Sequence, residues 1–157
     1  GIYDVLDCGL NFRLSDINSA LGVEQLKKLS KFLKIRKKNY LYLSKKIKEN
    51  SKLKLLNIDS EKDLISSHYC LSFIVEGVNR EKRNKYLNLL AKRGIGCSVY
   101  YPRVIPEYTY YKKNNYHKMN FPNARKISNN SICIPVGPHL TLKNLKFISS
   151  EIKKIFK

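Results

Sequence analysis

The 157-residue sequence predicts an α+β fold: two N-terminal helices, followed by a small sheet of three to four strands with helices packed on one face. Two patterns support this prediction. Apolar residues recur at helical spacing over residues 14–29 and 32–47, whereas residues 52–58 and 68–75 have the composition and alternation of strands. With 43% hydrophobic residues, the chain can bury one compact core.

Capping residues mark where the N-terminal helices begin. Residues 1–12 suit a short extended lead-in, after which Ser15 and Asp16 offer oxygens to the free backbone N–H groups of a first helix. Ser30 can cap a second, longer helix, whose outer faces carry pairs of lysines as an exposed amphipathic helix should. We therefore expect a break between two helices at Ser30.

The next part of the chain alternates helix and strand. Asn79 can cap a helix that continues to Arg93, and Gly94 follows at the usual place for a left-handed residue. Residues 95–101 are then expected to form a third strand. Residues 102–122 are rich in tyrosine and lack periodicity, and loops of that length inside compact domains are usually functional.

Three further elements complete the chain. Pro122 suits the first turn of a short helix, and residues 131–134 predict a brief strand. Thr141 can cap a final helix with one apolar stripe, formed by Leu145, Ile148, Ile152 and Ile155.

The net charge of +19 on its own suggests an anionic partner such as nucleic acid. However, the basic residues are mainly lysines spread along the whole chain, with abundant Asn, Ile and Tyr, which is the profile of AT-rich codons. Arginine, whose planar fork suits phosphate recognition, is scarce. Solvated lysines on helix faces are therefore the favoured interpretation, and a basic nucleic-acid-binding domain is the third-ranked alternative.

Neither a membrane nor a metal centre is expected. No apolar run approaches the roughly 18–20 residues that span a bilayer, and the start lacks a secretory pattern, so we expect a cytoplasmic protein. The four cysteines, Cys8, Cys70, Cys97 and Cys133, lie far apart without a CxxC pair, which argues against a metal site and a disulfide framework.

The segment around Asn11 and Arg13 is the strongest candidate for chemistry. The two side chains share one face if this segment is extended, and a helix N-terminus follows, which is an arrangement that can bind an anion. An ion pair between Arg13 and Asp16 beside the helix start explains the same residues equally well. The residues alone leave both interpretations open.

Residues 9–16 (Gly-Leu-Asn-Phe-Arg-Leu-Ser-Asp), with Gly-Val-Glu-Gln-Leu at 22–26, resemble the signature of the DegT/StrS-type sugar aminotransferases, fold-type-I enzymes that depend on pyridoxal 5'-phosphate (PLP). Further matches at 32–40, 99–102 and 131–135 extend this resemblance over nearly the whole chain. It implies that residues 1–30 are the tail of a large cofactor domain with the dimer-contact signature. Residues 31–157 would be the linker helix and the small C-terminal α+β domain.

The resemblance also implies a reaction. In that family, PLP carries an amino group from an amino acid, usually glutamate, to a keto group of a nucleotide-linked sugar, within a homodimer that supports cell-envelope polysaccharide synthesis. The residue matching Asn11 contacts the phosphate of the partner's cofactor across the dimer. Arg13 is carried over as a second cofactor-site residue, although the ion pair with Asp16 remains the slightly favoured interpretation.

The same resemblance predicts an incomplete catalytic site. The lysine that holds the cofactor covalently precedes the signature in family members, and the chain begins at Gly1 without an initiator methionine. We therefore expect a C-terminal portion that contains no catalytic residue and is inactive alone. A non-catalytic remnant or dimerisation module is the alternative. In either case, exposed apolar residues over 17–26 are expected to promote association of an isolated fragment.

Substrate contacts are expected near the Tyr-Tyr-Pro segment. The family commonly continues from it into a His-containing stretch, but here Arg103-Val-Ile-Pro follows. We predict that Tyr100, Tyr101 and Arg103 bind substrate, by stacking on a nucleotide base or contacting its diphosphate. Structural packing of the tyrosines is an equally favoured alternative. His68 is expected to be a packed or capping residue, and nothing in the sequence recommends His139 as a ligand.

Overall fold

The computed structural model describes residue 9 and residues 12–56, 66–113 and 120–157. The chain divides into two compact units, residues 1–31 and residues 32–157. The assignment of residues 1–30 to a large cofactor domain stays a prediction.

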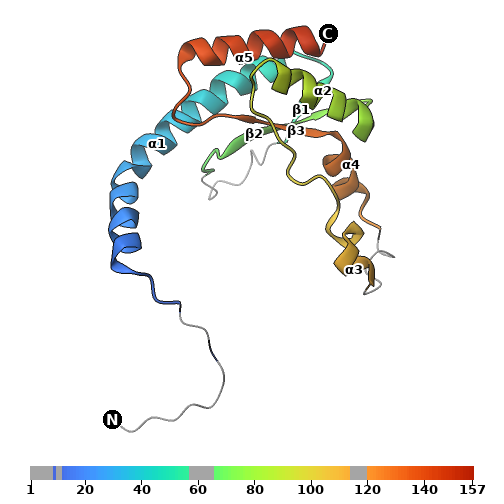
Figure 1. Cartoon of the computed structure of the whole chain (residues 1–157). Coiled ribbons are helices and arrows are strands. Elements are labelled where there is room, and N and C mark those ends of the chain that lie inside the picture. Colours follow the sequence, from blue (N-terminus) through green and yellow to red (C-terminus); the bar gives the residue numbers. More distant parts are fainter. Residues whose placement is uncertain (1–8, 10–11, 57–65, 114–119) are drawn as a thin grey trace. The chain divides into compact units, whose positions relative to one another are not determined.

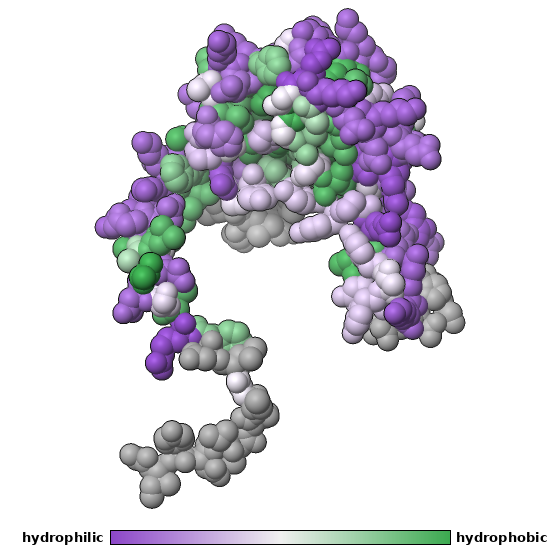
Figure 2. Space-filling view, viewed as in Figure 1, coloured by the Kyte–Doolittle hydropathy of each residue, from purple (hydrophilic) through white to green (hydrophobic). Residues whose placement is uncertain are grey.

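Helix α1 spans Asp16–Lys48 and is continuous (Figure 1). The break predicted at Ser30 is wrong, because neither Gly nor Pro lies near Ser30 to interrupt the backbone ladder, and serine is tolerated inside a helix. In the first unit, hydrophobic residues lie exposed among hydrophilic ones along α1 (Figure 2). The exposed apolar set from residue 12 to 29 is Phe12, Leu14, Ile17, Leu21, Val23, Leu26 and Leu29.

A three-stranded antiparallel sheet forms the centre of the second unit, with the order β1-β2-β3. The strands are β1 (Leu53–Leu55), β2 (Cys70–Val75) and β3 (Ser131–Pro135). Ser72 lies opposite Cys133 in the register of β2 and β3. The strand predicted over 95–101 is reduced to one isolated bridge between Ser98 and Cys133. Pro102, which has no N–H to donate, follows directly and limits further pairing.

Four more α-helices and a 3-10 turn complete the described chain. They are α2 (Arg80–Lys92), η1 (Ile105–Glu107), α3 (Thr109–Lys113), α4 (Pro122–Asn130) and α5 (Leu142–Ile155). Two predicted caps are confirmed: Asn79 accepts a hydrogen bond from the Lys82 N–H at 2.9 Å, and Thr141 forms a reciprocal capping box with Asn144. Gly94 has the expected left-handed backbone, with φ of 74°.

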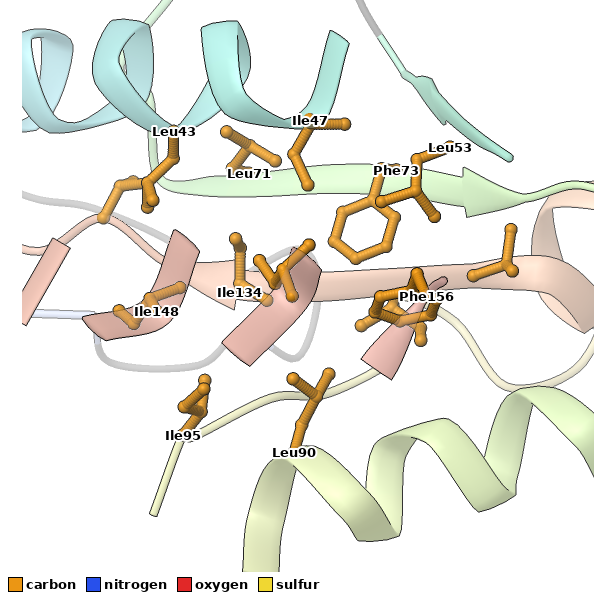
Figure 3. Close-up of a cluster of buried hydrophobic side chains, with 14 of the residues drawn as sticks. Leu43, Ile47, Leu53, Leu71, Phe73, Leu90, Ile95, Ile134, Ile148 and Phe156 are labelled. Atoms are coloured by element: carbon orange, nitrogen blue, oxygen red, sulfur yellow. The ribbon is translucent and has the colours of Figure 1, made fainter. Parts of the chain in front are cut away.

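The core lies between one face of the sheet and three helices (Figure 3). Alternate residues of β2, such as Leu71 and Phe73, point toward α1, α2 and α5, where they meet Leu43, Leu90 and Ile148. Phe73 packs edge-on against Phe156, with ring centroids 5.8 Å apart. The predicted α+β class, with helices on one sheet face, is therefore confirmed.

Two buried polar side chains, one at each end of β3, bind backbone carbonyl groups of the chain there. Asn39 of α1 is 4% exposed and donates to the Gly137 carbonyl at 3.0 Å and to the Val136 carbonyl at 3.3 Å. Arg83 of α2 is 1% exposed and donates to the Ser131 carbonyl at 3.0 Å. Because buried backbone carbonyls need partners, these contacts hold both ends of β3 in place.

Candidate functional site

A pocket of about 440 Å³ lies where α1, the start of β2, the end of β3 and the segment 96–100 meet. We call it the polar pocket. Its described lining consists of Arg36, Tyr69, Cys70, Gly96, Cys97, Ser98, Tyr100 and residues 133–139. Asn39 donates hydrogen bonds to the carbonyls of Val136 and Gly137, and these bonds hold that part of the pocket lining in place.

Arg36 supplies a cation to the polar pocket. Its guanidinium carbon lies 5.9 Å from the centroid of the Tyr69 ring, a cation–π contact. Its Nε atom is buried and has no hydrogen-bond partner within the described residues. A buried donor without a partner is costly in a folded protein, so a ligand with acceptor oxygens would satisfy it.

Two phenols lie beside Arg36. The rings of Tyr69 and Tyr100 are 6.3 Å apart between centroids. A hydrogen bond with Tyr100 raises the pKa of the Tyr69 hydroxyl, so the Tyr69 side chain is a neutral hydrogen-bonding group near neutral pH. The pocket is thus lined by one guanidinium and by the hydroxyl groups of two tyrosines.

His139 forms part of the rim of the polar pocket by packing against a glycine. A Cβ atom at Gly137 would lie 2.6 Å from Cε1 of His139, closer than atoms in contact can approach. Only glycine therefore allows the imidazole to occupy its present place.

Three thiols also line this pocket. The Oγ atom of Ser72 lies 3.0 Å from Sγ of Cys133 and 3.6 Å from Sγ of Cys70. Burial raises the pKa of the Cys97 and Cys133 thiols, so they are protonated and weakly reactive. No group of three or more potential ligands in the described chain is arranged to hold a metal ion. Cys8 lies outside the described residues.

The donor set decides which ligands the polar pocket fits. Its described lining contains no lysine and no carboxylate, so it offers no group to bond covalently to an aldehyde cofactor or to pair with a pyridine nitrogen. A cationic fork, two phenols and Ser98 instead suit an anionic, hydroxyl-bearing molecule. The described lining therefore fits an anionic ligand that is held without a covalent bond.

The predicted substrate residues divide between two pockets. Tyr100 lines the polar pocket, whereas Tyr101 and Arg103 line a second pocket of about 460 Å³. We call it the apolar pocket; its other lining residues are Val104, Ile105, Pro106, Phe121, Ala124, Ile127 and Ser128. The Tyr100 and Tyr101 rings are 5.7 Å apart between centroids, in edge-on contact, so the two pockets adjoin.

The predicted cofactor residues belong to the first unit. Asn11 lies outside the described residues. Arg13 is exposed just before α1 begins at Asp16. Their cofactor roles therefore stay predictions.

Sequence reasoning missed Arg36, His139 and Ser128. Arg36 carried one usable signal, because it is the only arginine in a helix whose other basic residues are all lysines. In a lysine-biased sequence, an arginine indicates a need for the planar fork. His139 and Ser128 carried no comparable signal, since their places depend on Gly137 and on the packing of α4 respectively.

Residues 2–153 match the model of the DegT/DnrJ/EryC1/StrS aminotransferase family. The chain belongs to this family. It is 27% identical over 147 residues to a dTDP-4-amino-4,6-dideoxy-D-glucose transaminase of Shigella dysenteriae, covering 94% of this chain and 39% of that protein. It is 28% identical over 152 residues to a UDP-4-amino-4,6-dideoxy-N-acetyl-beta-L-altrosamine transaminase of Campylobacter jejuni, covering 97% and 39%.

A solved structure shows the same relationship. The fold is similar to that of a putative sugar aminotransferase, Spr1654 from Streptococcus pneumoniae, in its PMP form, with a TM-score of 0.87 and 27% identity. The match covers 98% of this chain and 38% of that one. The chain thus spans about two fifths of the length of the relatives it matches.

No helix in the described part of the chain combines the length and apolar character that crossing a membrane requires.

Proposed function

We propose that this chain is the C-terminal part of a PLP-dependent aminotransferase that moves an amino group from an amino acid, glutamate, to a keto group of a nucleotide-linked sugar. Family membership over residues 2–153 supports the reaction class. The two curated relatives, whose names specify dTDP- and UDP-linked amino sugars, support the substrate class. The product would enter polysaccharide synthesis in the cytoplasm.

The cofactor and the residues of this chain would have separate roles. When bound, PLP supplies the electron sink for amino transfer. In the proposed homodimer, the Asn11 amide donates hydrogen bonds to the phosphate of the partner's cofactor, and Arg13 organises the same site. Residues 1–30 would then complete a large cofactor domain, with residues 31–157 as the linker helix and small domain.

The buried, unpartnered Nε of Arg36 is the observation that carries the substrate role of the polar pocket. A guanidinium binds carboxylate or phosphate oxygens in a bidentate manner, and Tyr69 holds this one in position. Tyr100 and Ser98 offer hydroxyls to the sugar. Arg36 therefore orients an anionic reactant, while the described lining leaves covalent chemistry to groups elsewhere.

Turnover by the complete protein tests the proposal. The protein encoded by the full reading frame, loaded with PLP, is incubated with glutamate and a UDP- or dTDP-linked 4-keto sugar. We expect catalytic release of 2-oxoglutarate together with an aminated nucleotide sugar in the mass spectrum. Without the sugar, only about one equivalent of 2-oxoglutarate per site should form, as in a two-stage transfer. Absence of 2-oxoglutarate from PLP-loaded protein would refute the proposal.

A further inference from the structure

We infer that the apolar pocket binds the nucleobase of the nucleotide-linked substrate, so that the two adjoining pockets hold the two ends of one extended ligand. This inference rests on the proposed function. It assigns a site to the part of the substrate that does not react.

The walls of the apolar pocket suit a planar ring. Two aromatic side chains, Tyr101 and Phe121, and the aliphatic residues Val104 and Ile127 line a space of about 460 Å³. Tyr101 is 69% exposed and Phe121 36% exposed, so part of each ring is accessible to a ligand. Bases stack on aromatic side chains whatever their sequence identity, because every base presents a π-face.

Ser128 supplies a polar contact inside this apolar space. It is 3% exposed, and its buried Oγ has no hydrogen-bond partner within the described residues. A serine hydroxyl both donates and accepts, so it can pair with a carbonyl or N–H on the edge of a base. A purely aliphatic ligand would leave this hydroxyl unsatisfied, which favours a heteroaromatic ring.

Ion pairs and a hydrogen bond connect the elements that form the apolar pocket. Glu107 of η1 lies 3.0 Å from Arg125 of α4 and 4.0 Å from Arg80 of α2. Arg80 also donates to Asn129 of α4 at 3.0 Å. These contacts hold the two sides of the pocket at a fixed separation, as is usual for small-molecule sites.

The position of Arg103 gives the ligand a direction. Its side chain lines the apolar pocket, is exposed, and forms no ion pair with the described residues, so its guanidinium is available to phosphate oxygens. At the shared boundary, Tyr101 faces one pocket and Tyr100 the other, with centroids 5.7 Å apart. A base beside Tyr101 would thus place its diphosphate near Arg103 and its sugar toward the polar pocket.

Saturation-transfer NMR on this chain tests the inference, with UDP, dTDP and GDP as probes. The key variant is Ala124→Phe, which fills the pocket from an exposed position of α4. The matched control is Ala91→Phe, the same change at an exposed position of α2 outside both pockets. Thermal melting of both variants shows whether each is folded.

We expect the base protons of at least one probe to receive the strongest saturation. Affinity for that probe should fall about tenfold or more in Ala124→Phe, as expected for loss of base stacking, and stay unchanged in Ala91→Phe. Ser128→Ala should weaken the same probe several-fold. Pyrophosphate, which lacks a base, should bind wild type and Ala124→Phe equally.

Three results would overturn the inference: no binding of any nucleotide to wild type, saturation confined to ribose protons, or equal affinity in the folded Ala124→Phe variant. These outcomes differ from failure of the proposed function. Turnover by the complete protein with unchanged nucleotide affinity in Ala124→Phe would refute the base site alone. Base binding without 2-oxoglutarate release would refute the reaction alone.

Discussion

The guanidinium of Arg36 lies over the ring of Tyr69, with 5.9 Å between its central carbon and the ring centroid. The Nε atom of this guanidinium is buried and has no hydrogen-bond partner within the described residues, so an acceptor oxygen would satisfy it. The cation is therefore held in place before any ligand arrives.

Removing this cation should weaken substrate binding. In the complete protein, Arg36→Met is expected to raise KM for the nucleotide sugar or for glutamate by roughly tenfold to a hundredfold, because a charge-assisted hydrogen bond contributes roughly 1.5–3 kcal/mol. Steady-state kinetics with each reactant varied identifies which one Arg36 binds. The control is Lys34→Met, which removes an exposed charge two residues earlier on α1. Unchanged KM values for both reactants in Arg36→Met would contradict the assigned role.

The chain alone should not bond covalently to PLP at a defined position. The described lining of the polar pocket contains no lysine, and no lysine of this sequence lies in the context of the family's cofactor lysine. After incubation with PLP and reduction with borohydride, peptide mapping should find only scattered, substoichiometric pyridoxyl groups. One lysine modified to about one equivalent would refute this expectation.

Glu151 should make stability depend on pH. It is 3% exposed and accepts hydrogen bonds from Lys154 at 2.6 Å and from Arg93. Lys154 and Arg93 lower the pKa of this carboxyl below its usual value of 4.5. As pH falls, the Glu151 carboxylate takes up a proton in the unfolded chain before it does so in the folded chain. The stabilisation is therefore present at neutral pH, and it is lost as the pH falls through the usual carboxyl pKa toward the lower pKa of the folded state.

Melting temperatures of two matched variants check this. At pH 7, Glu151→Gln should melt several degrees below wild type. Glu49→Gln, which breaks an exposed ion pair with Lys46, should change little. Near pH 3 the gap between wild type and Glu151→Gln should narrow. A gap that stays constant across this range would contradict the assignment.

Phe156 should be essential to the core, although it lies just beyond α5. It is 2% exposed and packs on Phe73 and on Tyr86, the latter at 4.7 Å between centroids. Phe156→Ala is expected to lower the free energy of unfolding by about 3–5 kcal/mol. In urea titrations, Phe147→Ala on the exposed side of α5 serves as the control, since Phe147 is 47% exposed. Equal losses in the two variants would mean that Phe156 is not buried in solution.

Local chemistry made several elements predictable from the sequence. Asn79 and Thr141 cap helices because their own oxygens reach nearby N–H groups, and Gly94 adopts a left-handed backbone that other residues resist. These contacts lie within a few residues of each other along the chain. Ser30 shows the limit, since the same side chain is compatible with a cap and with a helix interior.

The site was harder to predict, because its geometry depends on distant residues. Tyr100 and Tyr101 are adjacent in sequence but line different pockets, one bounded by β3 and the other by α4. Arg36 joins Tyr69 only because α1 and the start of β2 meet in the folded unit. Neither the separate pockets of Tyr100 and Tyr101 nor the contact of Arg36 with Tyr69 can be predicted from spacing along the sequence. The family signature was recognisable because its residues are contiguous.

The thiols that line the polar pocket also allow ligand binding to be measured by chemical labelling. Cys70 and Cys97 are partly accessible, while Cys133 is buried. A small alkylating reagent should reach the first two slowly through the pocket, and any molecule lodged there would block its path. The rate of labelling would then measure occupancy directly, without a chromophore or a completed catalytic cycle.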